Sequence, residues 1–302
     1  MPDVVSDCLI GASTYLHQIT QSSFNPNIQI LDGVASGSPY VMEQFIESAN
    51  PEAQITSVDL ANFMTIFGVQ GGQIASGVNV IVPYQKRKSG GTFQTGSANM
   101  EIQGVASCPV QLVPLSINAP RMGVPTAQGG LHFLSVDGIT QPWAGLVNQS
   151  LSAQVFEAMY GLGPVYVNGT RVPKQVGWNL NFGVGLSEKQ HWDGLPFPSD
   201  VFIETAKPSI EFNVEDFDLM ASITGGEAIT SFVCYLRARV QGGTYGTTGI
   251  SFTFSSGAIG VPLQLSASET KHGTAGVRVE GYTGTVTTNP LSFSTSASVP
   301  SP

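Results

Sequence analysis

The chain contains the same passage twice, and this internal repeat constrains its fold more than any other feature. Residues 37–68 (GSPYVMEQFIESANPEAQITSVDLANFMTIFG) align without a gap to residues 194–225 (GLPFPSDVFIETAKPSIEFNVEDFDLMASITG), with identity at ten of 32 positions. Unrelated segments of average composition would share roughly two. The run F-I-E-[S/T]-A-x-P, at 45–51 and 202–208, carries most of the match. Because internal repeats decide architecture before any local pattern does, the sequence predicts two copies of one domain.

The correspondence continues downstream in the same order. VIVPYQKRKSGGTF at 80–93 aligns with FVCYLRARVQGGTY at 232–245, and GLHFLSVDG at 130–138 aligns more weakly with GVRVEGYTG at 276–284. The offset between the two copies falls from 157 to 152 to 146, which predicts shorter loops in the second copy. We therefore expect a tandem duplication of a domain of roughly a hundred residues.

The predicted fold class is mainly β, with two tandem, similar antiparallel β-sandwich or barrel domains that each carry one short α-helix. The first β-domain, with an N-terminal arm, is expected over residues 1–145 and the second over 194–302, while residues 146–193 join them and supply the first strands of the second domain. Two similar domains in one chain imitate a dimer. If such domains pack side by side in a closed ring, their fusion halves the number of chains that the ring needs.

One helix is predicted in each copy. Thr56 and Asp59 form a capping-box pattern, and Gly68 suits the left-handed position that ends a helix. The apolar residues between them fall at i, i+3, i+4 and i+7, on one helical face: Leu60, Phe63, Met64 and Phe67. The expected helices are therefore Thr56–Phe67 and, with Asn213 and Asp216 at the cap positions, Asn213–Thr224.

Short apolar runs between Gly-containing turns predict the strands. These runs are Val78–Tyr84, Val110–Ile117, Leu131–Val136, Val261–Leu265 and Val277–Tyr282. Gly90–Gly91 and Gly242–Gly243 each separate two such runs and indicate a hairpin turn. The Ser- and Pro-rich tail SFSTSASVPSP is expected to be mobile or extended.

Composition narrows the function classes. Charged residues make up 11% of the chain, against roughly 25% in typical soluble domains, which fits either a β-protein covered by its neighbours or an ordinary secreted β-sandwich. The net charge of −9 opposes a nucleic-acid-binding surface, because affinity for phosphates comes from Lys and Arg. An acidic surface repels DNA, which suits a protein that lets DNA pass without binding it and also simply favours solubility.

The cysteines and the chain's apolar segments indicate an intracellular, membrane-free protein. Cys8, Cys108 and Cys234 are odd in number and lack metal-binding or redox spacing, so we expect buried free thiols in a reducing compartment. No basic segment followed by an apolar run opens the sequence, and no stretch approaches the length of a membrane span. The sequons at Asn148 and Asn168 are expected to be incidental.

Signals for enzyme chemistry are weak. His17, His132, His191 and His272 are far apart and lack metal-binding spacing. His191-Trp192-Asp193 places a base beside a carboxylate, although a packed loop corner is the commoner reason for such a run. No nucleophile elbow, phosphate-binding loop or dinucleotide fingerprint occurs. We expect no enzymatic activity, no metal and no cofactor.

The duplicated layout, the F-I-E-[S/T]-A-x-P segments and the GGTF/GGTY segments resemble tail-tube proteins of long-tailed bacteriophages. The resemblance covers residues 37–145 and 194–290 and includes no diagnostic functional motif. It implies a structural protein of the virion, assembled in the host cytoplasm, that forms homotrimeric rings with pseudo-sixfold symmetry. These rings would stack around a channel through which DNA passes without specific binding, and would contact other virion proteins. The alternatives are another virion component (a capsid decoration, tail hub or adaptor protein) and a glycan-binding or glycan-degrading β-protein.

Cations flank both GG turns. Lys86, Arg87 and Lys88 lie in the first copy, and Arg237 and Arg239 lie in the second, in a chain with only 12 Lys and Arg. A solvated hairpin tip explains such charges. The functional interpretation places them at subunit contacts, where they would meet carboxylates such as Glu47 or Glu204 and set register and association rate.

Overall fold

The structure of the protein is a computed structural model of a mainly β chain. It describes residues 2–3, 7–11, 13–34, 36, 41–86, 99–149, 158–187, 189, 191, 194–215, 228–239, 245–254, 257–268, 271–285 and 288–301. In these residues several antiparallel sheets surround a single α-helix, so the expected fold class is confirmed at this level. We call residues 2–149 the first half and residues 158–301 the second half.

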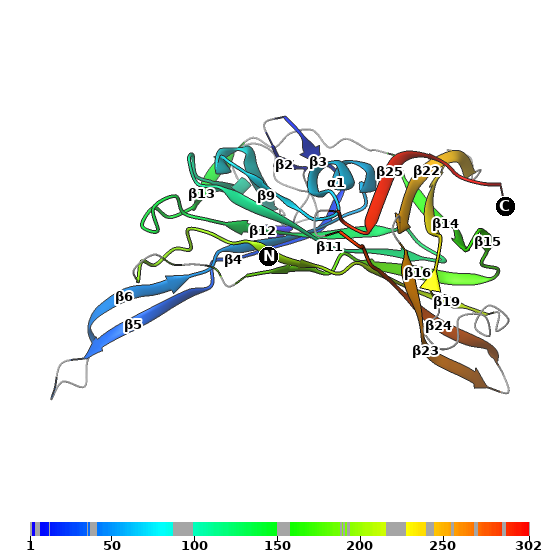
Figure 1. The fold of residues 1–302 in the computed structure, drawn as a ribbon. Helices are drawn as coiled ribbons and strands as arrows, with labels where there is room; N and C mark the ends of the chain where they lie inside the picture. Colours follow the sequence, from blue (N-terminus) through cyan, green and yellow to red (C-terminus); the bar gives the residue numbers. More distant parts are fainter. Residues whose placement is uncertain are drawn as a thin grey trace.

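A long antiparallel sheet runs through both halves (Figure 1). Its strands in spatial order are β20 (Ala228–Ile229), β23 (Ala258–Ser268), β24 (Lys271–Gly281), β19 (Ser209–Val214), β16 (Gln175–Asn181), β11 (Val110–Pro120), β12 (Thr126–Phe133), β7 (Glu52–Ser57) and β4 (Ile19–Asn25). β8 (Gly72–Ile74) also pairs with β11. The pairing of β11 with β16 joins the first half to the second.

Two smaller sheets lie above the long sheet in Figure 1, one over each half. The first contains β13 (Trp143–Gln149), β10 (Asn99–Gly104), β9 (Val80–Lys86), β2 (Cys8–Ile10) and β3 (Tyr15–Leu16), with β1 (Pro2–Asp3) paired to β9. The second contains β15 (Thr170–Arg171), β14 (Tyr160–Val167), β21 (Phe232–Arg239), β22 (Tyr245–Phe254) and β25 (Leu291–Ser298). Each small sheet and the half of the long sheet beneath it enclose apolar side chains.

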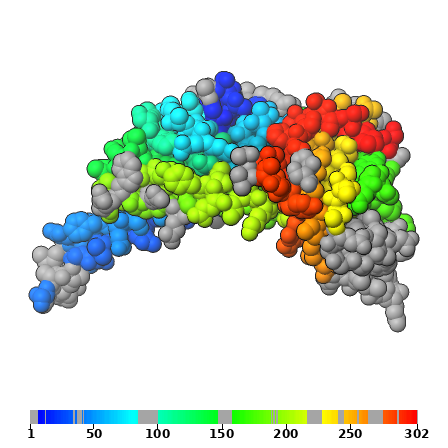
Figure 2. Space-filling view, viewed as in Figure 1, coloured from blue at the N-terminus to red at the C-terminus, as the bar shows by residue number. Residues whose placement is uncertain are grey.

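Two hairpins leave the long sheet. One consists of β5 (Ile28–Val34) and β6 (Val41–Ala49), and the other of β17 (Val184–Leu186) and β18 (Ile203–Ala206). The β5–β6 hairpin projects from the body of the molecule, at the lower left of Figures 1 and 2. The molecule is an arch whose concave lower side lies between this hairpin and the β23–β24 end (Figure 2).

Alternating residue character explains the strands of the long sheet. In β19 the apolar side chains of Ile210, Phe212 and Val214 are buried, while Glu211 and Asn213 between them are exposed. Successive side chains of a strand point to opposite faces, so one face of the sheet packs on the core and the other meets solvent.

Helix α1 (Leu60–Phe67) confirms the predicted helix in the first copy, with its four apolar residues buried. The expected capping box at Thr56 is wrong, since β7 runs to Ser57 and the cap is Asp59, whose side chain accepts the Asn62 N–H at 3.3 Å. The hydroxyl of Ser57 fixes this boundary, because it accepts the Asp59 N–H at 2.9 Å and donates to the His17 carbonyl at 2.6 Å. Gly68 ends the helix at φ 61°. Its placement and its positive φ agree with the prediction, whereas its ψ of −155° lies outside the left-handed helical region.

The other sequence predictions meet mixed outcomes. All five predicted strands overlap observed ones. The strand predicted at Leu131–Val136 lies too far towards the C-terminus, because β12 spans Thr126–Phe133. Residues 213 and 214 end strand β19 and Glu215 follows as a bend, whereas residues 216–224 of the second predicted helix lie outside the described residues, as do both GG turns. The C-terminal tail is extended, since most of it forms β25. Residues 146–193 contain β14–β17.

Candidate functional site

The predicted contact cations have separate surroundings. Lys86 ends β9, where its backbone pairs with Pro2, and Arg87 and Lys88 lie outside the described residues. Arg237 is 7% exposed and donates from Nη2 to the Pro300 carbonyl, so it ties the C-terminal segment to β21.

Arg239 reaches across the molecule instead. Its Nη2 donates to the carbonyl of Gly123, in the connection between β11 and β12 of the first half. The partner of Arg239 is thus a carbonyl group and not one of the expected carboxylates, Glu47 or Glu204. This hydrogen bond joins the two halves, and whether the cations also contact another chain stays a prediction.

We call the contact between the two halves the seam. Its centre is the antiparallel ladder that pairs residues 116–120 of β11 with residues 177–181 of β16. The Phe182 N–H extends the ladder by donating to the Leu115 carbonyl at 3.1 Å, and the Arg121 N–H extends its other end by donating to Val176 at 3.0 Å. The Arg121 guanidinium also pairs with Glu215 at 3.1 Å. No residue pattern predicts this pairing, because backbone hydrogen bonds carry no side-chain signature.

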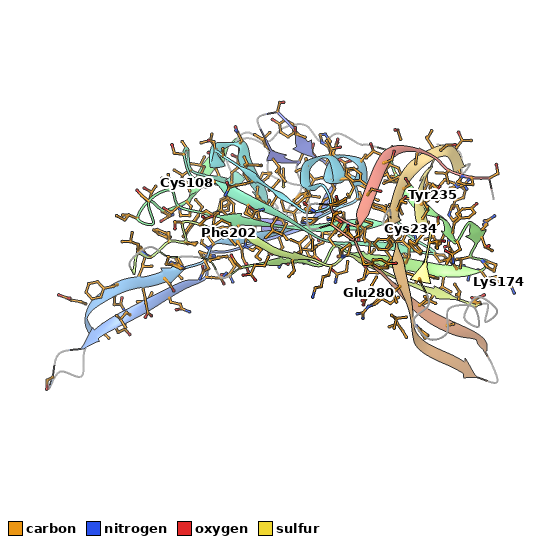
Figure 3. The ribbon with its side chains drawn as sticks, in the orientation of Figure 1. Cys108, Lys174, Phe202, Cys234, Tyr235 and Glu280 are labelled. Carbon is orange, nitrogen blue, oxygen red and sulfur yellow. The ribbon has the colours of Figure 1, made fainter. Side chains whose placement is uncertain are left out.

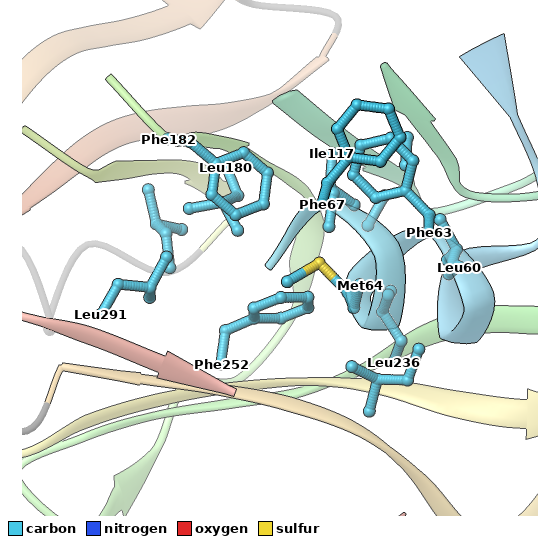
Figure 4. Close-up of a cluster of buried hydrophobic side chains, with 14 of the residues drawn as sticks. Leu60, Phe63, Met64, Phe67, Ile117, Leu180, Phe182, Leu236, Phe252 and Leu291 are labelled. Carbon is cyan, nitrogen blue, oxygen red and sulfur yellow. The ribbon is translucent and has the colours of Figure 1, made fainter. Parts of the chain in front are cut away.

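Apolar side chains close the seam above the ladder. Met64 of α1 lies in one cluster with Leu236 of β21 and Phe252 of β22 (Figure 4). The helix of the first half therefore packs on the small sheet of the second half, and the buried residues of both halves form one continuous core. Gly129 on β12 lets the helix approach the long sheet, since a Cβ there would lie 2.5 Å from the Phe67 ring.

The connection after β17 adds a third element to the seam. The Pro196 and Pro198 carbonyls accept hydrogen bonds from the backbone N–H groups of Ala49 and Ser135, each at 2.7 Å. Between them Phe197 packs edge-on against Trp143, with 5.7 Å between ring centroids. This segment of the second half therefore lies along the first half, where the β12 and β6 strands end.

The long sheet ends in two edges, β4 and β23, that lack a neighbouring strand along much of their length in the part of the chain that the structure describes. β4 pairs only with β7, and β23 has β20 beside Ala258 and Ile259 alone. Apolar side chains are exposed near both edges. On β23 these are Val261 (36%) and Leu263 (47%), and on β5, which follows β4, they are Ile28 (43%) and Ile30 (58%). Unpaired strand edges with apolar side chains are templates for pairing with another chain.

The solvent face of the long sheet is rich in amide side chains. Asn118 and Asn179 are exposed cross-strand neighbours at the seam. Gln128 donates to Gln54 at 3.4 Å. Arg278 on β24 is held between two carboxylates, since its guanidinium donates to Glu280 at 2.7 Å and lies 3.9 Å from Glu211. The positive charge of Arg278 is therefore compensated on this face.

The structure places the three cysteines and His191 in different surroundings. Cys8, Cys108 and Cys234 are buried free thiols, as predicted, and burial raises the pKa of each; Figure 3 shows Cys108 and Cys234 inside the two halves. His191 donates from Nδ1 to the Leu195 carbonyl, at 3.1 Å, and Trp192 and Asp193 lie outside the described residues. Within the described ranges, no group of three His, Cys, Asp or Glu residues could hold a metal ion.

One histidine lies in a charged environment between the halves. The Nδ1 atom of His132 is 3.7 Å from Glu52. Burial, followed by the charge of nearby Lys189, lowers the pKa of His132 to about 4. His132 is therefore neutral at pH 7, and its ring contributes no positive charge to the sheet face.

Comparisons with known proteins leave the family open. No helix in the described residues is long and apolar enough to cross a membrane. No protein-family model matches the sequence, and no curated protein matches it either.

Proposed function

We propose that the chain is a structural virion protein of the tail-tube type, in which two duplicated β-domains occupy neighbouring positions of a ring. The observation that carries this proposal is the seam. Within the chain, β16 of the second half pairs with β11 of the first half. The open edges β4 and β23 are the counterparts of β16 and β11, so the same pairing can be repeated between chains.

The order of strands supports the duplication. The small sheets have the orders β13-β10-β9-β2-β3 and β25-β22-β21-β14-β15, which coincide when each strand is replaced by its counterpart. The long sheet is likewise β11-β12-β7-β4 in the first half and β23-β24-β19-β16 in the second. In the described residues each half thus contributes four main strands and one short strand, β8 or β20, to the long sheet beneath one small sheet.

The ladders agree residue by residue. β7 and β19 have bounds that differ by 157 at both ends, the offset of the sequence repeat. A bulge falls at Leu115 in β11 and at Leu263 in β23, each time within a V-P-L segment, an offset of 148. A second bulge falls at Thr20 in β4 and at Val176 in β16. The β12–β24 correspondence also has the offset 148, so the predicted offset of 146 is wrong by two residues.

Backbone details recur as well. Gln18 and Lys174 have φ 52° and 48°, and Asn27 and Gly183 have φ 47° and 60°, each pair separated by 156 residues. The side chain of Asn25 accepts the Asn27 N–H at 3.0 Å, and its counterpart Asn181 accepts the Gly183 N–H at 2.8 Å. Non-glycine residues seldom adopt positive φ, so this agreement supports a common origin of the two halves.

Burial differs between counterparts in the way that ring closure requires. Val113 on β11, at the seam, is 2% exposed, whereas its counterpart Val261 on β23 is 36% exposed. Ile250 on β22 lies in the core, fully buried, whereas its counterpart Met100 on β10 is 43% exposed. Positions that the seam covers in one half are therefore uncovered at the free end of the other, which a neighbouring chain would cover.

The seam also predicts the register between chains. Asn179 pairs with Asn118, so Ser23 of one chain is expected to pair with Ser266 of the next. Arg87 corresponds to Arg239, and would donate to a backbone carbonyl near Lys271 of the neighbouring chain, as Arg239 does to Gly123. This sharpens the predicted subunit contact of the hairpin cations.

The stagger of the strands suits a barrel. Asn181 pairs with Ser116, and the same cross-strand row continues through Gln128 and Thr56 to Gln21. Gln21 precedes Asn25, the counterpart of Asn181, by four residues. Four residues of ~3.3 Å over four strands of ~4.8 Å give a strand tilt of ~35°, close to that of closed barrels. Barrels of more than about 16 strands leave an open channel, and four strands per half in three chains would make 24.

The concave face suits a channel that DNA crosses without binding. Amide side chains dominate it, and Arg278 is neutralised by Glu211 and Glu280. Because phosphate binding depends on available Lys and Arg, this wall would offer the passing backbone little to hold. The net charge of −9 acts in the same direction.

Interchain disulfides test the ring directly. In the double variant Ser23→Cys/Ser266→Cys, oxidation is expected to link chains covalently up to three and no further, as measured by denaturing electrophoresis. Asn118→Cys/Asn179→Cys, at the corresponding seam pair, is the matched control and should close within one chain. Ser23→Cys/Ala267→Cys shifts the register by one residue, which turns one thiol to the other face, and should not form the bond.

The outcomes separate the candidate functions. A ladder that continues beyond three chains would indicate an open fibre, and no link at all would reject edge pairing. Negative-stain images of wild-type protein at increasing concentration then distinguish stacked rings from discrete trimers. Discrete trimers that bind capsids or baseplates would favour a decoration, hub or adaptor protein.

A further inference from the structure

The segment that the two halves share most closely lies on the surface. The repeat F-I-E begins at Phe45 in β6 and at Phe202 just before β18, and the two phenylalanines are 52% and 53% exposed. A core role explains the matching residues of the long sheet, since they pack against one another. It does not explain an identical, half-exposed aromatic side chain at the same place in both halves.

The seam does not cover this position. In the second half the contact with the neighbouring half is already made, through Pro196, Phe197 and Pro198. Phe202 nevertheless remains as exposed as Phe45 of the first half. By contrast, the exposed fraction is 2% for Val113 and 36% for Val261. Lateral contact between halves therefore leaves both phenylalanines free for a different partner.

Both hairpins leave the long sheet at the same rim. β5 follows the end of β4 at Asn25, and β17 follows the end of β16 at Asn181, which are counterparts. Phe202 lies beneath the first half, towards the β5–β6 hairpin (Figure 3). In a ring built by repeating the seam, all the hairpins emerge at one end of the ring.

We propose that Phe45 and Phe202 form the stacking contact with a second ring of this chain, an inference that rests on the proposed ring. The six hairpins of a ring need a partner that repeats one binding surface at six pseudo-equivalent positions. The opposite end of another ring provides such a partner. A contact between opposite ends of two rings is heterologous, and it extends without closing into a tube. A two-stranded hairpin is only marginally stable without a covering surface, and exposed apolar groups that recur regularly mark interaction sites.

The double variant Phe45→Ser/Phe202→Ser tests the proposal. Rings with the mass of three chains should form as in the wild type, as measured by light scattering. The protein concentration at which tubes appear in negative stain should rise at least about tenfold, because buried aromatic anchors dominate interface free energy. Tyr15→Ser is the matched control, because Tyr15 is a 39% exposed aromatic whose counterpart is Arg171.

The result separates the two proposals. Wild-type protein that never forms three-chain rings contradicts the proposed function, whatever the variant does. Rings that form but stack normally in the variant overturn the stacking contact, and so does a folded variant that loses its rings. If the double variant misfolds, Phe202→Cys alone decides. Its thiol should react with a maleimide in isolated rings and be protected in tubes, while the three native thiols are buried and stay unlabelled. Equal labelling in rings and tubes overturns the proposal.

Discussion

The two ends of the long sheet differ from its middle in one respect. In the middle, β11 and β16 are paired and Val113 is buried; at the ends, β4 and β23 lack a neighbouring strand along much of their length in the described residues, and Val261 is exposed. The difference lies in the neighbour and not in the strands, since the ladders and bulges of the two halves coincide. A contact seen once inside a chain thus describes a contact expected between chains. The following predictions test that correspondence.

The largest difference is expected between Val113→Asp and Val261→Asp. Val113 is buried at the seam, so an unpaired charge there should cost several kcal/mol and unfold much of the chain. Val261 is 36% exposed in the single chain, and its variant should keep the wild-type melting temperature but stay monomeric. Thermal melts and light scattering measure the two effects. Equal destabilisation by both substitutions would contradict the correspondence.

Truncation of a second pair of corresponding residues, Ile250 and Met100, should show the same contrast between stability and assembly with a smaller effect. Ile250→Ala removes a fully buried side chain and should lower the free energy of unfolding by about 2–5 kcal/mol. Met100→Ala, at the counterpart position, should change monomer stability by less than about 0.5 kcal/mol and weaken ring formation instead. Urea denaturation of the monomer and sedimentation of the ring distinguish these results. A Met100→Ala variant with unchanged assembly would mean that the neighbouring chain does not reach β10.

Acid should destabilise the chain through His132, which lies in the first half. The pKa of His132 is lowered to about 4, below its unfolded value of about 6.5, so the unfolded chain binds more protons between these values. Stability is therefore complete above pH 6.5 and falls as the pH drops, by about 2 kcal/mol at pH 5. Glu280 stands at the counterpart position in the second half. Urea titrations of wild type and His132→Gln at pH 7 and pH 5 measure the effect, which the variant should lose.

The smallest effect concerns the helix caps. Asp59 is buried and accepts hydrogen bonds from the backbone of His17 and of Asn62, so Asp59→Ala should cost about 1 kcal/mol. If residues 216–225 form the equivalent helix, Asp216→Ala should cost a similar amount. Denaturant titrations of both variants decide, and no loss at Asp216 would show that the copies differ there.

The sequence predicts the local elements better than their assembly. Periodicity located α1 and its buried face, because side-chain spacing reports directly on which face is buried. The repeat aligned the segments that form β7 and β19 but predicted neither strand. The capping residue was wrong because Ser57 hydrogen-bonds back to the His17 carbonyl, a contact between distant segments. The seam could not be predicted, since β11 and β16 pair through backbone groups that every residue possesses. The intrachain partner of Arg239, the Gly123 carbonyl, could not be predicted for the same reason.

The seam has a kinetic consequence for the proposed ring. The peptide chain tethers β16 to the half that carries β11, so this contact forms at the high effective concentration of an intramolecular step. Only three of the six contacts between halves in the ring then depend on collisions between chains. Incomplete rings therefore expose fewer unpaired strand edges before they close. Synthesis of both halves in one chain also fixes their ratio at one to one, so the two kinds of position can diverge in sequence without being misplaced in the ring.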